Sequence, residues 1–222
     1  MIFVMSIAFS QDSLKWEAGI QGGPNAATYY GVSALKKDFD LKYQLKPGFV
    51  AGVSVQYFRK PKSTVCAEIN FERKGNTVIS PVFTETGERL NDIKTNTRAD
   101  YITLPITFRL LFGRRSVNFF IQAGPYIGYL LAMQDRIPAY GNIPATTQKD
   151  NLAYYQSIDY GVVAGLGMHI PISKRFALTP EIRNNLGLSR LVKGSSYNNQ
   201  FAKNESFALM IGLKYGLHHP GK

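Results

Sequence analysis

The chain has 222 residues, of which 45% are hydrophobic and 18% are charged. This size suits a single all-β domain, and the composition excludes a disordered chain. The formal net charge is +11, but the basic residues occur in twos and threes at turn-like places, so no nucleic-acid partner is expected. Cys66 is the only cysteine, so the sequence predicts no internal disulfide, no zinc site and no cofactor.

The N-terminal segment has the pattern of an export signal. An apolar run from Met1 ends at Ala8-Phe9-Ser10, which places small residues at the two positions that a signal peptidase inspects. We therefore expect a signal peptide at residues 1–10, with a start further upstream because basic residues are missing, and one barrel domain at 11–222. A buried first strand is the alternative. Further along, no stretch approaches ~18 consecutive apolar residues, which excludes a membrane-spanning helix, so a membrane protein of this sequence must be a barrel.

Apolar and polar residues alternate with period two along most of the chain, which is typical of β-strands with one apolar face. Three prolines inside these segments, Pro105, Pro125 and Pro180, predict bulges or strand ends, because proline lacks a backbone donor. The eight predicted strands are 14–21, 49–57, 65–72, 101–109, 117–130, 159–170, 176–183 and 207–215.

The connections between these strands alternate between two lengths. Short turns are expected at 59–62, 113–116 and 172–175, and long loops at 23–46, 75–98, 132–155 and 188–203. This alternation places every long loop at one end of the sheet, as in outer-membrane barrels. The fold class predicted is therefore an all-β, eight-stranded antiparallel up-and-down transmembrane β-barrel with short periplasmic turns and long extracellular loops.

Three features favour lipid on the apolar side of this barrel over a soluble lipocalin-type barrel. The polar positions are rich in glycine, which suits a crowded interior. The apolar positions have no charged residue at the strand centres, where lipid would make one costly. Trp16, Tyr57 and Tyr215 lie near strand ends on the apolar side, as interfacial aromatic residues do. We therefore expect a bacterial outer-membrane location with lipids as partners.

Several of these strand motifs resemble the PorT-like outer-membrane β-barrel family. The resemblance covers nearly the whole mature chain and implies the same barrel fold. That family is named after a member associated with protein secretion and gliding machinery, so the resemblance implies an accessory role in secretion, and it supplies no catalytic residue. The matching motifs are Gly19-Ile20-Gln21-Gly22-Gly23-Pro24-Asn25, Tyr101-Ile102-Thr103-Leu104-Pro105-Ile106, Gln122-Ala123-Gly124-Pro125-Tyr126-Ile127-Gly128, Asp159-Tyr160-Gly161 and Gly165-Leu166-Gly167.

The inward positions of the predicted strands collect charged residues of both signs. Eight strands enclose an interior that side chains fill, so these charges must pair. We expect Arg109 to pair with Glu68 or Glu72, and Arg183 or Lys214 to pair with Glu17 or Glu181. The network either holds the barrel closed or rearranges as a gate for ions. Its predicted members are Glu17, Glu68, Glu72, Arg109, Asp159, Glu181, Arg183 and Lys214.

Basic residues in the short turns predict a positively charged periplasmic rim. Such a rim contacts phospholipid headgroups or binds an acidic periplasmic protein, including a component of a secretion machine. Its predicted members are Arg59, Lys60, Lys62, Arg114, Arg115, Lys174 and Arg175.

The sequence predicts no catalytic residues. Of three histidines only His169 lies within a strand, near enough to Glu181 for a hydrogen bond, and such a pair is more often structural than catalytic. The predicted function is a non-enzymatic outer-membrane barrel with a structural or binding role and exposed loops. A narrow gated channel, a lipid-modifying barrel enzyme and a soluble lipocalin-like binder are the alternatives.

Overall fold

A computed structural model describes residues 16–31, 37–60, 62–84, 86–114, 117–139, 144–149, 151–194 and 201–217. The predicted signal peptide at 1–10 and the histidines of the C-terminal tail lie outside these ranges. The described elements are β1 (Trp16–Tyr30), β2 (Lys42–Gln44), β3 (Lys46–Lys60), β4 (Ser63–Phe83), β5 (Arg89–Arg114), β6 (Val117–Ile137), β7 (Thr146–Lys149), the short helix η1 (Asn151–Ala153), β8 (Ile158–Pro171), β9 (Phe176–Gly187) and β10 (Lys203–Leu217).

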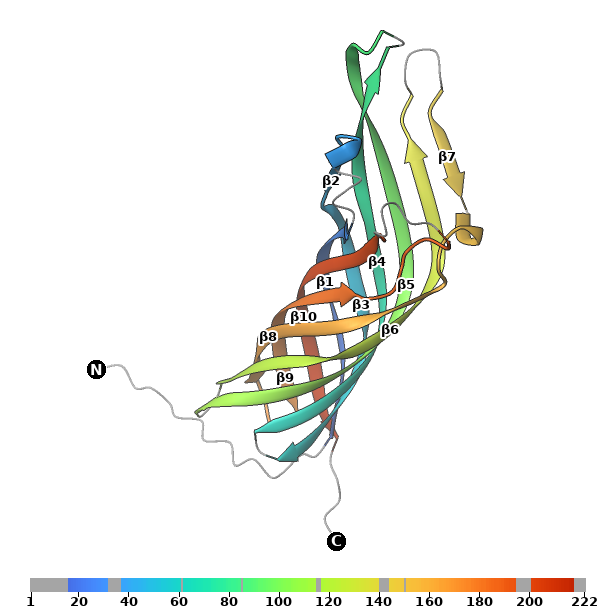
Figure 1. The fold of residues 1–222 in the computed structure, drawn as a ribbon. Coiled ribbons are helices and arrows are strands. Elements are labelled where there is room, and N and C mark those ends of the chain that lie inside the picture. Colours follow the sequence, from blue (N-terminus) through green and yellow to red (C-terminus); the bar gives the residue numbers. More distant parts are fainter. Residues whose placement is uncertain are drawn as a thin grey trace, which may run out of the picture.

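Eight of these strands close into a ring of antiparallel pairs (Figure 1). The order around the ring is β1, β3, β4, β5, β6, β8, β9 and β10, and β10 pairs again with β1. Each strand pairs with its neighbours along the chain, which makes an up-and-down barrel. The predicted fold class is confirmed. No helix in the described ranges is long and apolar enough to cross a membrane.

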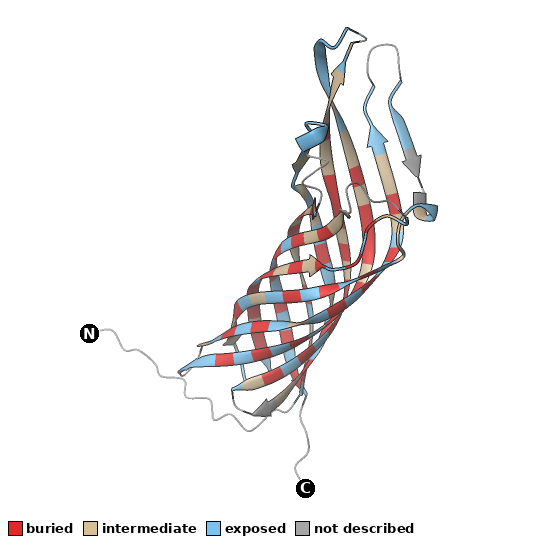
Figure 2. Ribbon diagram, in the orientation of Figure 1, coloured by how far each residue is buried: buried red, intermediate tan, exposed pale blue. Residues whose placement is uncertain are grey.

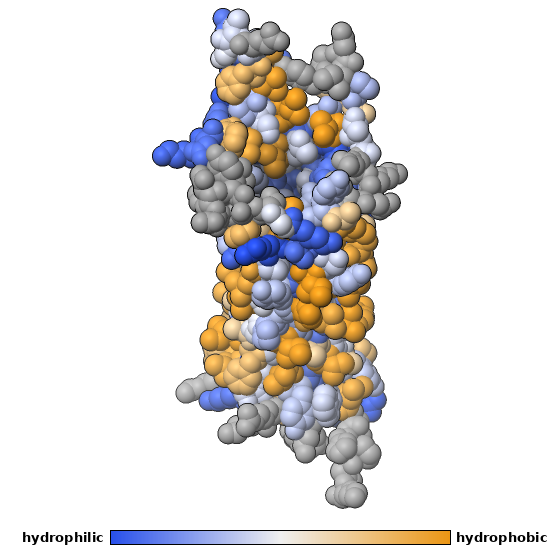
Figure 3. Space-filling view, turned by 45° about the vertical axis from the view of Figure 1, so that its right-hand side comes forward, coloured by the Kyte–Doolittle hydropathy of each residue, from blue (hydrophilic) through white to orange (hydrophobic). Residues whose placement is uncertain are grey.

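The apolar side of the strands lies outside the barrel. Ile211 on β10 is 59% exposed, whereas the neighbouring Met210 is 1% exposed. The same alternation of exposed and buried residues follows the other strands of the ring (Figure 2), and hydrophobic side chains cover much of the barrel on the face that Figure 3 shows. Trp16 and Tyr57, whose ring centroids lie 4.7 Å apart, mark the short-turn end of this surface. This arrangement fits lipid outside and polar side chains inside.

The strands extend much further at the long-loop end than the sequence pattern predicts. The predicted loop at 75–98 is wrong, because β4 continues to Phe83 and β5 begins at Arg89. The predicted loops at 23–46 and 132–155 are also shorter, because β1 runs to Tyr30 and β6 to Ile137. Together with β2 and β7, the ends of β4, β5 and β6 form a sheet that rises from one side of the barrel (Figure 1). We call this sheet the extension.

Apolar alternation does not predict the strands of the extension, and the reason is physical. Its backbone ladder is intact, with β4 and β5 paired to Pro81↔Asp92. Neither side of such a ladder needs apolar residues once the strands leave the lipid, because water can face both sides. Backbone pairing therefore continues where the sequence signal ends.

The three prolines do not form bulges or strand ends. Around Pro105 the ladder to β4 lacks two residue pairs and resumes in the same register, while Pro105 stays paired with Tyr126 on β6. Pro125 and Pro180 interrupt the β5–β6 and β8–β9 ladders in the same way. A proline removes only one donor, so one neighbour is affected and the other is retained. The register shifts lie elsewhere, at Phe58/Lys60, Pro81/Phe83 and Asp100/Tyr101.

Candidate functional site in the barrel interior

The structure places all eight charged residues of the predicted lumenal network inside the barrel. Each is at most 7% exposed, so none of these charges is solvated in the ordinary way. A buried charge is tolerated only where partners compensate for its lost hydration. The arrangement of those partners therefore determines what the interior can do.

Two arginines and two glutamates form the centre of this network. Arg183 on β9 binds Glu68 on β4 with Nη1–Oε2 2.7 Å and Nη2–Oε1 2.8 Å. Arg109 on β5 contacts both Glu68 and Glu181, each at 3.2 Å. Arg183 also donates to Glu181 on its own strand. We call Glu68, Arg109, Glu181 and Arg183 the central cluster.

The central cluster connects strands that are not neighbours in the ring. The strands β4 and β5 form one part of the wall, whereas β9 is separated from them by β6 and β8 on one side. The ion pairs of Arg183 with Glu68 and of Arg109 with Glu181 therefore cross the interior. The four charged side chains of the central cluster therefore fill the middle of the lumen, and their mutual ion pairs hold them in place.

Neutral groups complete the hydrogen bonding of Arg109. Its Nε donates to Gln122 Oε1 at 2.8 Å, and its Nη1 donates to Gln56 Oε1 at 3.2 Å. The guanidinium also lies 4.7 Å from the centroid of the Phe120 ring. Arginine is suited to such a site because its planar group has donors in fixed directions and packs on aromatic faces.

Lys214 does not pair with a glutamate, which corrects the prediction for this residue. Its Nζ donates to Gln21 Oε1 at 3.1 Å and to the Ser54 hydroxyl, and among the described residues it has no carboxylate within 4.0 Å. The register explains this outcome. Lys214 lies opposite Ala177, four residues along β9 from Glu181, a separation of about 13 Å.

The short-turn end of the lumen contains a histidine–carboxylate pair. His169 Nε2 lies 3.2 Å from Glu17 Oε2, so the hydrogen bond expected with Glu181 is replaced by one with Glu17. Gln56 also donates to Glu17, and Phe58 packs edge-on against the histidine ring. Within the described part of the chain, neither His169 nor Glu17 bonds to a serine, threonine or cysteine side chain.

A second ionic cluster, nearer the long-loop end, includes a residue that the sequence prediction missed. Lys74 Nζ lies 3.4 Å from Glu72 and 3.6 Å from Asp159, and Lys74 is 2% exposed. Its ammonium also lies 4.9 Å from the centroid of the Tyr126 ring. The signal was available, because Lys74 has the same strand parity as Glu68 and Glu72. Hydrogen bonds also stabilise the two carboxylates. Glu72 accepts them from Ser206 and Asn185, and Asp159 accepts them from Ser189, Asn204 and Tyr126.

Apolar and aromatic side chains cover the interior above this second cluster. Ala99, Tyr101, Leu130 and Met133 are fully or almost fully buried, and Leu152 and Tyr155 from the segment around η1 pack against them. The Tyr155 hydroxyl donates to Asp135 Oδ2 at 3.3 Å. Burial and the neighbouring charge of Asp135 raise the pKa of Tyr155 to about 12.

The predicted basic rim is described only in part. Lys62, Lys174 and Arg175 are exposed in the short turns, and Arg175 Nη1 donates to the Tyr215 hydroxyl at 3.0 Å. The backbone of Arg59, Lys60 and Arg114 lies at strand ends of the same rim, and Arg115 lies outside the described residues. No group of three or more potential metal ligands occurs in the described ranges.

Comparisons with known proteins identify the family of this chain and several similar folds. Residues 9–193 match the family model described as outer membrane protein beta-barrel domain. Solved structures with similar folds include the attachment invasion locus protein Ail of Yersinia pestis, with 11% identity, 90% of this chain and 99% of that chain covered and a TM-score of 0.42. Neisserial surface protein A has 12% identity, 90% and 97% coverage and a TM-score of 0.47. OprG from Pseudomonas aeruginosa has 12% identity, 91% and 97% coverage and a TM-score of 0.46. A search of curated proteins finds no match.

Proposed function

Because this chain belongs to the outer membrane protein beta-barrel domain family and lies in the bacterial outer membrane, we propose that it is a closed, non-enzymatic barrel that anchors the extension at the cell surface. In outer-membrane barrels the short turns face the periplasm and the long connections face outside. The extension is then the extracellular part, and the barrel is its membrane anchor.

The central cluster is the observation that supports this function best. Arg109 and Arg183 form ion pairs across the interior with Glu68 and Glu181. Opening a water-filled path through this level requires separating buried, hydrogen-bonded charges, which typically costs about 3–5 kcal/mol for each charge left unpaired. A lumen held in this way favours an anchor over a pore.

Conductance across a planar lipid bilayer tests the proposal. The purified barrel should insert without producing reproducible unitary currents. A variant that replaces all four residues of the central cluster by serine, Glu68→Ser/Arg109→Ser/Glu181→Ser/Arg183→Ser, leaves no buried charge of the cluster unpaired and should conduct if the central cluster is what closes the lumen. Stable unitary currents from the parent protein would reject the closed anchor.

A narrow gated channel is the second candidate, and one observation favours it. The side-chain amides of Asn25 and Asn76 are buried at the long-loop end of the lumen and have no hydrogen-bond partner within the described protein atoms. Buried polar groups of this kind are usually satisfied by ordered water. Conductance that appears only above a threshold voltage or at low pH would support this candidate.

We further propose that the barrel is not an enzyme. The pair of His169 with Glu17 lacks a bonded nucleophile in the described residues, whereas covalent catalysis needs a nucleophile within reach of its base. Lipid deacylation or proteolysis that is lost in His169→Ala would contradict this.

The resemblance to PorT-like barrels leads to a proposal about partners. The exposed Lys62, Lys174 and Arg175 would bind an acidic surface of a periplasmic secretion component through charge complementarity. Neutralising the three residues to glutamine should reduce co-purification of such a component without changing barrel assembly. Unchanged protein secretion after deletion of the gene would contradict the proposed role in secretion.

The export route is part of the same proposal. Residues 1–10 would be removed before Gln11, leaving a single mature domain from 11 to 222. N-terminal sequencing of the outer-membrane form should begin at Gln11, and retention of Met1 would contradict it.

A further inference from the structure

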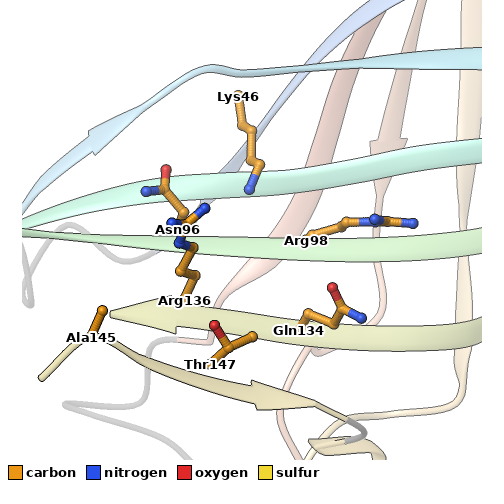
Figure 4. A pocket seen from close by; sticks show the side chains of 7 residues that line it. All are labelled: Lys46, Asn96, Arg98, Gln134, Arg136, Ala145 and Thr147. Carbon is orange, nitrogen blue, oxygen red and sulfur yellow. The ribbon is translucent and has the colours of Figure 1, made fainter. Parts of the chain in front are cut away.

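A polar pocket lies on the extension and is lined by Lys46, Asn96, Arg98, Gln134, Arg136, Ala145 and Thr147 (Figure 4). Its volume is about 440 Å³. The ladder aligns these residues, with Asn96 opposite Arg136 and Arg98 opposite Gln134. Alternate residues of a strand share one side of the sheet, so these four side chains lie on the same side.

The pocket lies on the outer side of the sheet. The intervening residues Thr97 and Ala99 are buried on the other side, where Ala99 belongs to the apolar group above the lumen. Arg98 and Arg136 therefore face away from the barrel axis. Ligands can reach this side from the membrane surface or from the external medium.

Among the described residues, three cationic side chains and no acidic side chain line the pocket. Arg98 shares Asp100 with Arg73 outside the pocket. Lys46 and Arg136 form no ion pair within the described ranges. The lining therefore has an excess of positive charge, and the amide and hydroxyl groups of Asn96, Gln134 and Thr147 are available as further donors.

The approach of Lys46 to this site depends on Gly75. Gly75 on β4 pairs with Arg98 on β5 and has φ +151°. A Cβ atom at Gly75 would lie 3.1 Å from Lys46 Cδ, so the missing side chain leaves room for the lysine stem. Lys46 lies beyond the lipid-facing part of β3. Burial and the positive charges of Arg98 and Arg73 lower its pKa, and the negative charge of Asp135 opposes part of this effect. Lys46 and Arg98, two of the three cations in the lining, are thus close enough to repel each other.

The pocket lies directly above the apolar surface of the barrel. Arg73 Cζ lies 4.9 Å from the centroid of the Phe49 ring, and Arg73 pairs with Asp100. An arginine stacked on an exposed aromatic residue is typical of a membrane interface. Arg98 and Asn96 follow two and four residues beyond Asp100 on β5, so the pocket begins at the level of the lipid headgroups.

We propose that this pocket binds a phosphate group of an anionic glycolipid in the outer leaflet of the outer membrane. A phosphate monoester has up to two negative charges and three acceptor oxygens, which match the three cations and the neutral donors better than a single carboxylate does. Bidentate binding by Arg98 or Arg136 would fix its orientation. The inference goes beyond the proposed function, because a conducting barrel could have the same site.

Binding of diphosphoryl lipid A to the detergent-solubilised full-length barrel tests this assignment. The double variant Lys46→Gln/Arg136→Gln should bind at least about tenfold more weakly than the parent, since each charge-assisted hydrogen bond is typically worth about that factor or more. Arg98 is left unchanged because its loss would also release Asp100. The control Lys37→Gln/Lys193→Gln removes the same charge from exposed positions outside the pocket and should bind like the parent.

Two further ligands identify what is recognised. Dephosphorylated lipid A should bind the parent and the double variant equally weakly, and inorganic phosphate should compete only at concentrations far above those of the lipid. Equal binding of diphosphoryl lipid A by the parent and the double variant would overturn the site. Competition by inorganic phosphate at the same concentration as the lipid would overturn the lipid source. If the double variant loses the heat-stable barrel form, Arg136→Gln alone, at an exposed position, provides the same comparison.

Discussion

Arg183 on β9 and Glu68 on β4 form a two-point ion pair inside the barrel, with nitrogen–oxygen distances of 2.7 and 2.8 Å. The two strands are not neighbours in the ring, so this pair ties opposite parts of the wall together. Both side chains are nearly inaccessible, at 2% and 0% exposure. The pair therefore acts as an internal brace as well as an obstruction.

Loss of one partner of this brace should be much more harmful than loss of both. In Arg183→Met, Glu68 and Glu181 share Arg109 as their remaining cationic partner, so the buried site has an excess of negative charge. We expect the free energy of unfolding to fall by about 3–5 kcal/mol. The double variant Arg183→Met/Glu68→Met should recover much of this stability. The temperature at which the folded, fast-migrating form disappears on a detergent gel measures both. Additive losses in the two single variants and the double variant would contradict direct coupling.

Two glycines of β6 should respond differently to the same substitution. A Cβ atom at Gly124 would lie 2.0 Å from the Ile106 carbonyl oxygen, which belongs to the backbone and cannot move alone. At Gly128 the nearest atom would be the Thr103 methyl carbon at 3.3 Å. We expect Gly124→Ala to destabilise the barrel by about 1–3 kcal/mol and Gly128→Ala to cost less. Equal shifts in the heat-unfolding temperature would show that the strands adjust freely.

The sequence predicts the barrel well because lipid and a crowded interior impose alternation on each strand. Ile211 and Met210 differ in exposure as their parity requires. Strand order then follows from the lengths of the connections. These constraints are local and can be recognised without knowing the register.

The pairing of individual charges depends on the position of each residue along the barrel axis. This position is set by the register between strands, which local sequence patterns do not predict. Lys214 has the correct parity to meet Glu181, but four residues of β9 separate their levels, and Gln21 and Ser54 are its partners instead. The extension is missed for a different reason, since its ladder continues in water without apolar alternation. The pocket around Lys46 and Arg136 depends on that missed pairing and could not be assembled from the sequence.

An arginine on the lipid-facing side should impair insertion, whereas the same residue on the extension should not. Ile211 and Leu90 are similarly exposed, at 59% and 54%, but Ile211 lies in the barrel and Leu90 in the extension. Ile211→Arg should cost roughly 2–4 kcal/mol if it lies near the bilayer midplane. The yield of folded protein after refolding into lipid vesicles measures the effect. Equal yields for Ile211→Arg and Leu90→Arg would contradict lipid contact at Ile211.

Tyr155 should make the covering of the lumen sensitive to alkaline pH. Its pKa is raised to about 12, while an unfolded tyrosine ionises near pH ~10. Its stabilising contribution is therefore complete below about pH 10 and is lost as the pH rises through 12. The ultraviolet tyrosinate absorbance of the parent minus that of Tyr155→Phe should show this late ionisation. A difference curve with its midpoint near pH ~10 would mean that Tyr155 is solvated.

Lys74 provides the sharpest test of whether the second ionic cluster stabilises the barrel. Its ammonium lies 3.4 Å from Glu72 and 3.6 Å from Asp159, and these are the acidic side chains within ion-pair distance of it in the described residues. Lys74→Met removes the cation from between two buried carboxylates, so we expect a loss of about 3–5 kcal/mol and a clear fall in the heat-unfolding temperature.

Two control variants separate charge from packing at this position. Lys74→Arg retains the charge in a larger group and should lose less stability than Lys74→Met, although repacking beside Tyr126 prevents full retention. Lys94→Met makes the same chemical change at an exposed position of β5 and should leave the unfolding temperature unchanged. If Lys74→Met unfolds at the same temperature as Lys94→Met, the carboxylates of Glu72 and Asp159 do not need the lysine. Their hydrogen bonds to Ser206, Asn185, Ser189 and Asn204 would then be sufficient to hold them.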